Sequence, residues 1–224
     1  MELIEAQQVS FSELYEVTFD MVVGVAGYES RCPYMFEKMV LVDEIKVALA
    51  FRERSSDLHR PENNQKLRDM GFNFVEESGH SLVDVGSILE SLAGDQKSTL
   101  NILVDYSCMT KMWYASFVNY FIRNELPYKK ISVYFSYTSS TFSEPKKPVS
   151  LKLAEPLGSG PYGLIKGKPV ALIIGLGYEK NKAEFLHKTL EPDMTYVFYA
   201  DPTDDKRFVE KVYINNFRLI DHLH

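Results

Sequence analysis

The sequence has few cysteines and no apolar run long enough for a membrane. Its 224 residues include two cysteines, Cys32 and Cys108, too few for a disulfide framework or a cysteine-based metal cluster. The longest apolar runs, such as 170–176, are far shorter than the roughly 20 residues that a membrane-spanning helix needs. Residues 1–5 lack the basic-then-apolar pattern of a signal peptide. We therefore expect a cytoplasmic protein in a reducing environment.

The sequence also lacks an excess of positive charge and any complete cofactor motif. The net charge is −6 and the sequence pI is about 5.5, which argues against a broad basic surface for duplex DNA. The five histidines are scattered without metal-ligand spacing, apart from a terminal pair. The glycines in 24–27 and 175–177 do not complete a dinucleotide-binding motif. The sequence predicts no cofactor, no metal and no duplex DNA partner.

Apolar runs of strand length alternate with amphipathic segments along residues 1–138. Continuous apolar runs of this kind are typical of parallel strands that are buried on both faces. The expected strands are 19–26, 45–51, 73–76, 100–104 and 131–137. The expected helices are 32–42, 62–70, 81–93 and 109–124. This alternation predicts an α/β fold with a doubly wound, Rossmann-like, mostly parallel sheet and helices on both faces.

The composition changes after residue 138. Residues 139–168 are rich in proline and glycine and form a connecting arm, because a structureless stretch this long is functional or a linker. Residues 169–224 return to the earlier pattern as a βαβα extension, which we expect to continue the same sheet. The elements expected there are a strand at 170–175, a helix at 180–189, a strand at 196–200 and a helix at 206–212.

One short sequence occurs after two different expected strands. Gly27-Tyr28-Glu29 follows the first strand, and Gly177-Tyr178-Glu179 follows the strand at 170–175. A basic residue comes two or three positions later in both places. The matched placement indicates that the C-terminal part is a partial repeat of the first βαβ unit. Tyr178 and Glu179 are therefore further candidates for ligand contact.

The segment from Asp105 to Lys111 is the first candidate for a binding site. A buried strand ends at an acid, turns through hydroxyl residues and enters a helix with a lysine in its first turn. The N-terminus of a helix presents unpaired N–H groups and partial positive charge, which favour anions. An alternative role for Asp105 is helix capping alone. The candidate ligand-binding residues in this segment are Asp105, Tyr106, Ser107, Thr110 and Lys111.

The loop after the first strand is the second candidate segment. In doubly wound sheets, ligands bind beyond the carboxyl ends of the strands, where the strand order reverses. If the first and fourth strands are neighbours there, the two segments face each other. Together they supply aromatic rings, carboxylates, hydroxyls and cations, which suit a nucleotide. The candidates in this loop are Gly27, Tyr28, Glu29 and Arg31.

The stretch 105–112 resembles CRISPR-associated Rossmann-fold (CARF) ligand sensors and the related SAVED sensors. Asp105 at the strand end and Thr110-Lys111 before an apolar helix carry the resemblance. It implies a homodimeric sensor of cyclic or linear oligonucleotide second messengers, acting in a bacterial defence or stress system. It also implies that Thr110 and Lys111 contact phosphates, with the loop at 27–31 closing the other side.

Three functions are therefore considered. The leading interpretation is a sensor or regulatory domain that binds a nucleotide or similar anionic small molecule. The first alternative is an N-glycosidase-like, nucleotide- or nucleoside-processing enzyme with Glu29 as its catalytic carboxylate. Cys108 would be a nucleophile if the following helix lowered its pKa, but we interpret it as a buried, inert thiol. The second alternative is a structural subunit of a larger complex that binds a partner through the arm at 139–168.

Overall fold

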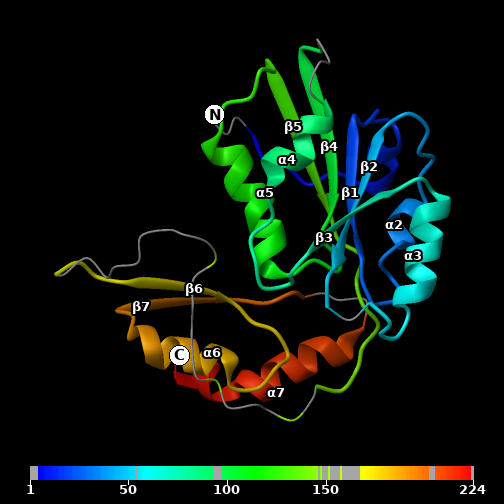
Figure 1. The fold of residues 1–224 in the computed structure, drawn as a ribbon. Helices are drawn as coiled ribbons and strands as arrows, with labels where there is room; N and C mark the ends of the chain where they lie inside the picture. Colours follow the sequence, from blue (N-terminus) through cyan, green and yellow to red (C-terminus); the bar gives the residue numbers. More distant parts are fainter. Residues whose placement is uncertain are drawn as a thin grey trace. The chain divides into compact units, whose positions relative to one another are not determined.

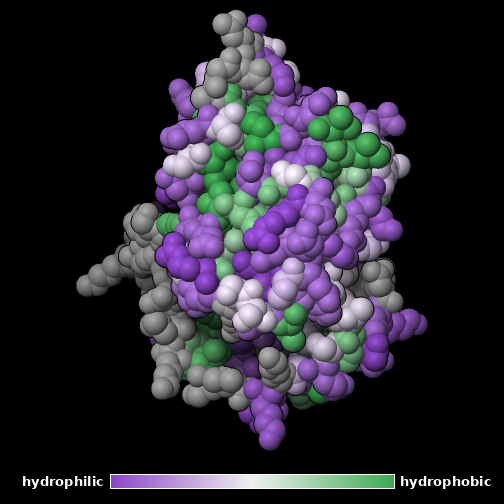
Figure 2. Space-filling model, turned by 45° about the vertical axis from the view of Figure 1, so that its right-hand side comes forward, coloured by the Kyte–Doolittle hydropathy of each residue, from purple (hydrophilic) through white to green (hydrophobic). Residues whose placement is uncertain are grey.

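The structure is a computed structural model, shown as a ribbon in Figure 1. It describes residues 5–53, 55–92, 97–145, 147, 151, 157, 167–201 and 205–222. The chain divides into two compact units, residues 1–140 and 141–224, which are described separately. None of the helices in the described part is both long enough and apolar enough to span a bilayer. The face in Figure 2 is largely hydrophilic, with its hydrophobic residues in separate groups.

The first unit is built on a five-stranded, all-parallel sheet with the strand order β3-β2-β1-β4-β5. The strands are β1 Met21–Ala26, β2 Ile45–Phe51, β3 Asn73–Glu77, β4 Thr99–Asp105 and β5 Lys130–Ser136. Every residue of β1 is buried, as expected for the central strand of a parallel sheet. This order is that of a doubly wound, Rossmann-like sheet, and it confirms the predicted fold class.

Helices cover both faces of this sheet (Figure 1). One face carries α4, η1 and α5, whose apolar side chains pack with Trp113 and Phe117 at the centre. The other face carries α1, α2 and α3, which contribute Leu14, Phe36 and Leu67. The bounds are α1 Phe11–Tyr15, α2 Tyr34–Glu37, α3 Arg60–Asp69, α4 Val85–Leu89, η1 Glu90–Leu92 and α5 Lys111–Arg123.

Close packing fixes two positions near the site. The Phe36 ring lies against Gly24 of β1, and a Cβ atom at Gly24 would come 2.4 Å from Phe36 Cε2. On the other face, the rings of Phe51 and Trp113 stack with their centroids 4.3 Å apart. The indole Nε1 of Trp113 donates to the carbonyl of Ser78 at 2.9 Å. These contacts anchor the carboxyl ends of β1 and β2 to the helices beside them.

Two predicted helices are shorter than their sequence patterns indicated. The helix expected at 32–42 is reduced to the four residues of α2, and Val40 and Val42 are exposed instead of packed. The helix expected at 81–93 begins only after Asp84, whose side chain caps it by accepting from the amide of Ser87 at 3.2 Å. In both cases the apolar spacing was present but tertiary burial decided which part became helical.

The second unit contains a separate, two-stranded parallel sheet. Its elements are β6 Ala171–Gly175, α6 Lys182–Leu190, β7 Met194–Phe198 and α7 Lys206–His222. The expectation that 169–224 would extend the first sheet was wrong, because β6 and β7 pair with each other in a sheet of their own. The last helix is also much longer than the expected 206–212. Most of the arm at 139–168 lies outside the described residues.

Candidate functional site

The carboxyl ends of β1 and β4 lie side by side in the sheet. The two strands pair in parallel, with Met21 opposite Ile102 and Val23 opposite Val104. The chain leaves β1 toward β2 on one side, and β4 lies on the other, so this edge is the topological switch point of the sheet. The adjacency on which the predicted site depended is therefore confirmed. The loops after these two strands form the candidate site.

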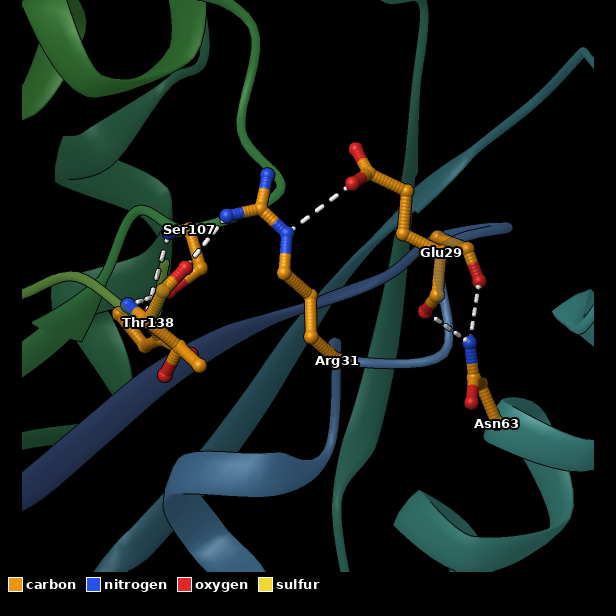
Figure 3. A network of polar contacts seen from close by, with 7 residues as sticks. Glu29, Arg31, Asn63, Ser107 and Thr138 are labelled. Carbon is orange, nitrogen blue, oxygen red and sulfur yellow. Dashed lines mark hydrogen bonds and ion pairs between the residues drawn. The ribbon is translucent and has the colours of Figure 1, made fainter. Parts of the chain in front are cut away.

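Asn63 of α3 holds the loop that follows β1. Its side-chain amide donates to the carbonyl of Gly27 at 2.9 Å and to the carbonyl of Glu29 at 2.7 Å (Figure 3). Asn63 is only 2% exposed, so water cannot replace these bonds. The amide of His59 adds a third bond, to the carbonyl of Tyr28 at 3.3 Å. The Gly-Tyr-Glu loop is thus fixed from below by residues at the start of α3.

Arg31 connects this loop to the end of β5. Its Nε atom lies 3.0 Å from the carboxylate of Glu29, and its guanidinium donates to the carbonyl of Thr138 (Figure 3). The guanidinium also lies over the Tyr137 ring, 5.4 Å from its centroid. Burial lowers the pKa of Arg31, but interactions with Tyr137 and Glu29 outweigh it and the net pKa is raised. Arg31 is therefore a permanent cation whose donors serve the protein itself.

Asp105 lies beneath the surface, at the end of β4. It is 2% exposed and accepts hydrogen bonds from the Ser107 hydroxyl and from the Ser107 amide, the latter at 3.2 Å. The same hydroxyl accepts from the amide of Thr138 at 2.7 Å. Burial raises the pKa of Asp105, although the bonds from Ser107 oppose the shift. Asp105 thus orients Ser107, and Ser107 positions the backbone that receives Arg31.

Aromatic rings line the β4 and β5 side of the site. Tyr106 stacks on Tyr137 with ring centroids 5.3 Å apart, and Tyr114 meets Tyr106 edge-on at 5.6 Å. Tyr137 is 55% exposed, although Tyr106 stacks on its ring and the Arg31 guanidinium lies over it. On the other side, Tyr28 leans on Phe51 at 6.1 Å. Partly exposed aromatic side chains therefore lie beside the Arg31 guanidinium.

Helix α5 begins at the same edge. Thr110 is its N-cap, with a side chain that accepts from the amide of Trp113 at 3.3 Å. Capping is therefore the role of Thr110, and the proposed capping role of Asp105 is not found. Lys111 is the first helical residue, is exposed, and makes no ion pair with another described residue. Its exposed ammonium group and the partial positive charge at the start of α5 both favour an anion at this edge.

The two cysteines meet under the loops. A Cβ atom at Gly27 would lie 2.9 Å from the Cys32 sulfur and 3.7 Å from Cys108 Cβ. The pKa of Cys108 is raised by its side-chain interaction with Cys32 and by burial. A thiol activated by the helix that follows is therefore not found at Cys108. No local pattern in the sequence indicated that these residues, 76 positions apart, would be neighbours.

The second Gly-Tyr-Glu loop is held in the same way within its own unit. It follows β6 as the first loop follows β1, and asparagines of α7 bind its carbonyls. Asn216 donates to Gly177 at 2.9 Å and Asn215 donates to Tyr178 at 2.5 Å. Asn63 does the same in the first unit. The two loops thus share an asparagine clamp as well as three residues of sequence.

The surroundings of the second loop differ from those of the first. Glu179 pairs with Lys182 at 2.5 Å, where Glu29 pairs with Arg31. Tyr178 packs against Phe208 instead of a strand residue. A hollow of about 350 Å³ lies on this unit, but its lining comes from α6, α7 and the turn before α6. Tyr178 and Glu179 therefore form a loop of the second unit with neighbours of a different kind.

The structure brings the predicted first-unit residues to one edge and adds several that the sequence analysis missed. Asn63, Tyr137 and Thr138 were not predicted. Tyr137 and Thr138 directly follow β5, and the rule that ligands bind at carboxyl strand ends would have selected them. Asn63 gave no local signal, since its partners are 34 and 36 residues away. In the described part of the chain, no group of three or more His, Cys, Asp or Glu side chains is arranged to hold a metal.

These features define the first unit as a Rossmann-like parallel α/β unit whose polar and aromatic side chains gather at its switch point. Comparisons with family models, curated proteins and solved structures found no match to this chain.

Proposed function

We propose that the first unit binds a nucleotide, or a nucleotide-like anionic small molecule, at the carboxyl ends of β1 and β4. The observation that carries this proposal is the strand order, which places the loop at 27–31 beside the segment at 105–111 at the switch point. Ligand sites occur preferentially at such points because no helix covers the strand ends there.

The side chains at this edge match the parts of a nucleotide. The exposed ring of Tyr137, stacked on Tyr106, suits a base. The carboxylate of Glu29 is 40% exposed and suits a ribose hydroxyl or an exocyclic amine. Lys111, with the amides at the start of α5, suits a phosphate. Each contact uses a group that still has accessible surface.

The internal bonds of Arg31 favour a sensor over a passive binding site. Its Nε atom donates to Glu29, and its Nη1 atom donates to the Thr138 carbonyl. A ligand phosphate is a stronger acceptor for a guanidinium than a neutral carbonyl is. An anionic ligand therefore competes for Arg31 and releases residue 138. Ligand binding would therefore change the local structure around residue 138, and a regulatory module needs such a change.

The resemblance to CARF and SAVED sensors narrows the proposal to oligonucleotide second messengers bound by a homodimer. Thr110 and Lys111 carry that resemblance, and both lie at the proposed phosphate position. A dimer would place two such edges together around one cyclic ligand. This narrower form is tested by the same ligand panel, together with a measurement of solution mass.

The proposal is tested by a thermal-shift screen of the full chain against mono-, di- and cyclic oligonucleotides. A ligand at 100 times its dissociation constant stabilises by about 2.7 kcal/mol, which raises the Tm by roughly 5–10 °C. Lys111→Ala should abolish the shift and leave the fold intact, because Lys111 is exposed. Lys130→Ala is the matched control, since it removes the same charge at the amino end of β5.

Two results would overturn the proposal. If no nucleotide raises the Tm, the chemistry of the ligand is wrong. If Lys111→Ala keeps the same shift as Lys130→Ala, the ligand binds elsewhere and the site is wrong.

A further inference from the structure

The two cysteines lie on the two loops that form the site. Cys32 follows Arg31 directly, and Cys108 follows Ser107 directly. The chain thus carries a thiol at each end of the connection that runs from Arg31 through Thr138 to Ser107. The cysteines lie on the loops after β1 and β4, which are adjacent strands. Any bond between them would join the two halves of the site.

The two cysteine side chains lie on either side of a common point beside Gly27. The Cys32 sulfur and Cys108 Cβ both contact the space beside the Gly27 Cα, at 2.9 Å and 3.7 Å from the same point. Gly27 carries no side chain that would separate them. Both cysteines are free in this structure, Cys32 buried and Cys108 half-buried. Disulfide formation requires Cβ atoms about 4 Å apart, and two loops at adjacent strand ends can meet this requirement.

We propose that Cys32 and Cys108 form a reversible disulfide that fastens the loop after β1 to the loop after β4. This is a modification site with a peroxide as its oxidant. A thiolate of the pair attacks one oxygen of the peroxide, which breaks the O–O bond and gives a sulfenic acid and hydroxide; the hydroxide takes up the proton that the thiol had lost and becomes one water. The second thiol then attacks the sulfenic sulfur, forming the S–S bond and releasing a second water. Overall, the two thiols lose two protons and two electrons, and the peroxide gains them to become two waters.

The assignment of the two thiols follows from their surroundings. The pKa of Cys32 is lowered by its interaction with Cys108 and by the backbone of Gly27 and Glu29, against the effect of burial. The pKa of Cys108 is raised, so one proton leaves the pair more readily than two. Cys32 therefore supplies the thiolate, and Cys108 is the resolving thiol. Because Cys108 is partly exposed, we expect a small peroxide to approach the pair from its side.

The disulfide would restrict the movement of Arg31. Arg31 is bonded to Glu29 and Thr138 in this structure, and fixing the neighbouring Cys32 would hold it in those bonds. Oxidation should then weaken the binding of any ligand that must contact Arg31. This consequence rests on the proposed nucleotide-binding function, whereas the formation of the disulfide does not.

The test uses the full chain, reduced, desalted and treated with hydrogen peroxide. Remaining thiols are blocked with N-ethylmaleimide, and the digest is analysed by mass spectrometry without reduction. We expect the peptides that contain Cys32 and Cys108 to be joined, with a mass lower by two hydrogens than their sum. Dithiothreitol should restore two alkylatable thiols. Cys108→Ser should leave an oxidised but unlinked Cys32.

Several outcomes would overturn the proposal. These are two thiols that stay alkylatable, sulfinic acids without a cross-link, or a disulfide only between separate chains on a non-reducing gel. A second experiment repeats the nucleotide screen on oxidised and on reduced protein. If the cross-link forms but the ligand shift is the same in both forms, the disulfide does not control ligand binding. If neither form shows a ligand shift, the binding function fails but the disulfide stands.

Discussion

The hydrogen bonds from Asn63 allow the most direct test of how the site is held. Asn63→Ala removes two bonds, at 2.9 Å and 2.7 Å, to carbonyls of the Gly-Tyr-Glu loop. A typical hydrogen bond contributes about 1 kcal/mol net, and a buried carbonyl left without a partner costs roughly 1–3 kcal/mol. Because Asn63 is buried, we expect the free energy of unfolding to fall by about 2–4 kcal/mol.

The assay is urea unfolding followed by tryptophan fluorescence. Trp113 is the single tryptophan of the chain, is fully buried and lies in the first unit, so its emission reports on the unit that contains the site. Asn124→Ala is the matched control. Its side-chain amide also donates to a carbonyl, that of Tyr120 at 2.9 Å, but it is exposed. Water can replace that bond, so we expect a change below about 0.5 kcal/mol.

A second substitution at position 63 tests whether the residue must donate hydrogen bonds to the loop. Asn63→Asp keeps the shape but replaces a donor by an acceptor that faces two carbonyls. At neutral pH it should destabilise at least as much as Asn63→Ala, and the deficit should shrink at acidic pH, where the introduced carboxyl becomes protonated and can donate. If Asn63→Ala costs no more than Asn124→Ala, or Asn63→Asp is as stable as the wild type, the clamp is not a structural support.

Substitutions of Asp105, Gly24 and Glu29 test three further features of the packing and charges. Asp105→Asn removes a buried charge but keeps an acceptor for Ser107. Burial raises the folded-state pKa of Asp105, so wild-type stability falls as pH rises through that pKa, and the variant should gain relative to wild type from acidic to neutral pH in paired urea titrations. A difference in unfolding free energy between variant and wild type that does not change with pH would contradict this expectation. Gly24→Ala should cost about 1–3 kcal/mol, because its Cβ would lie 2.4 Å from the Phe36 ring. Phe36→Leu should relieve part of that cost, so strict additivity in a double-mutant cycle would argue against the contact. Glu29→Gln should change stability by less than about 1 kcal/mol, because its pair is partly exposed. Loss of a measured nucleoside turnover in this variant would favour the enzyme alternative.

Strands were predicted well because burial on both faces leaves a local signature. β2 was predicted at its exact bounds, and β1 within two residues, from continuous apolar runs. Helices were predicted less well where an apolar stripe had no surface to cover. Val40 and Val42 extend the stripe of α2, yet both are exposed and the helix ends before them.

The site could be predicted only in part, because several interactions that hold it join residues far apart in the sequence. Candidate residues at strand ends follow from a local pattern combined with the rule for doubly wound sheets. The hydrogen bond from Arg31 to Thr138 joins residues 107 positions apart. The bonds from Asn63 and the contact between the cysteines are likewise long-range. No single stretch of sequence contains both partners, so such supports become visible only in the folded chain.

Thr138 lies close to the point where the chain leaves the first unit. Its amide donates to Ser107, its carbonyl accepts from Arg31, and the boundary between the two units falls after residue 140. The chain is thus tethered two residues before the boundary by the same arginine that an anionic ligand would engage. Under the proposed function, ligand occupancy and the bond from Arg31 to Thr138 would be linked equilibria, and each would shift the other by the same free energy.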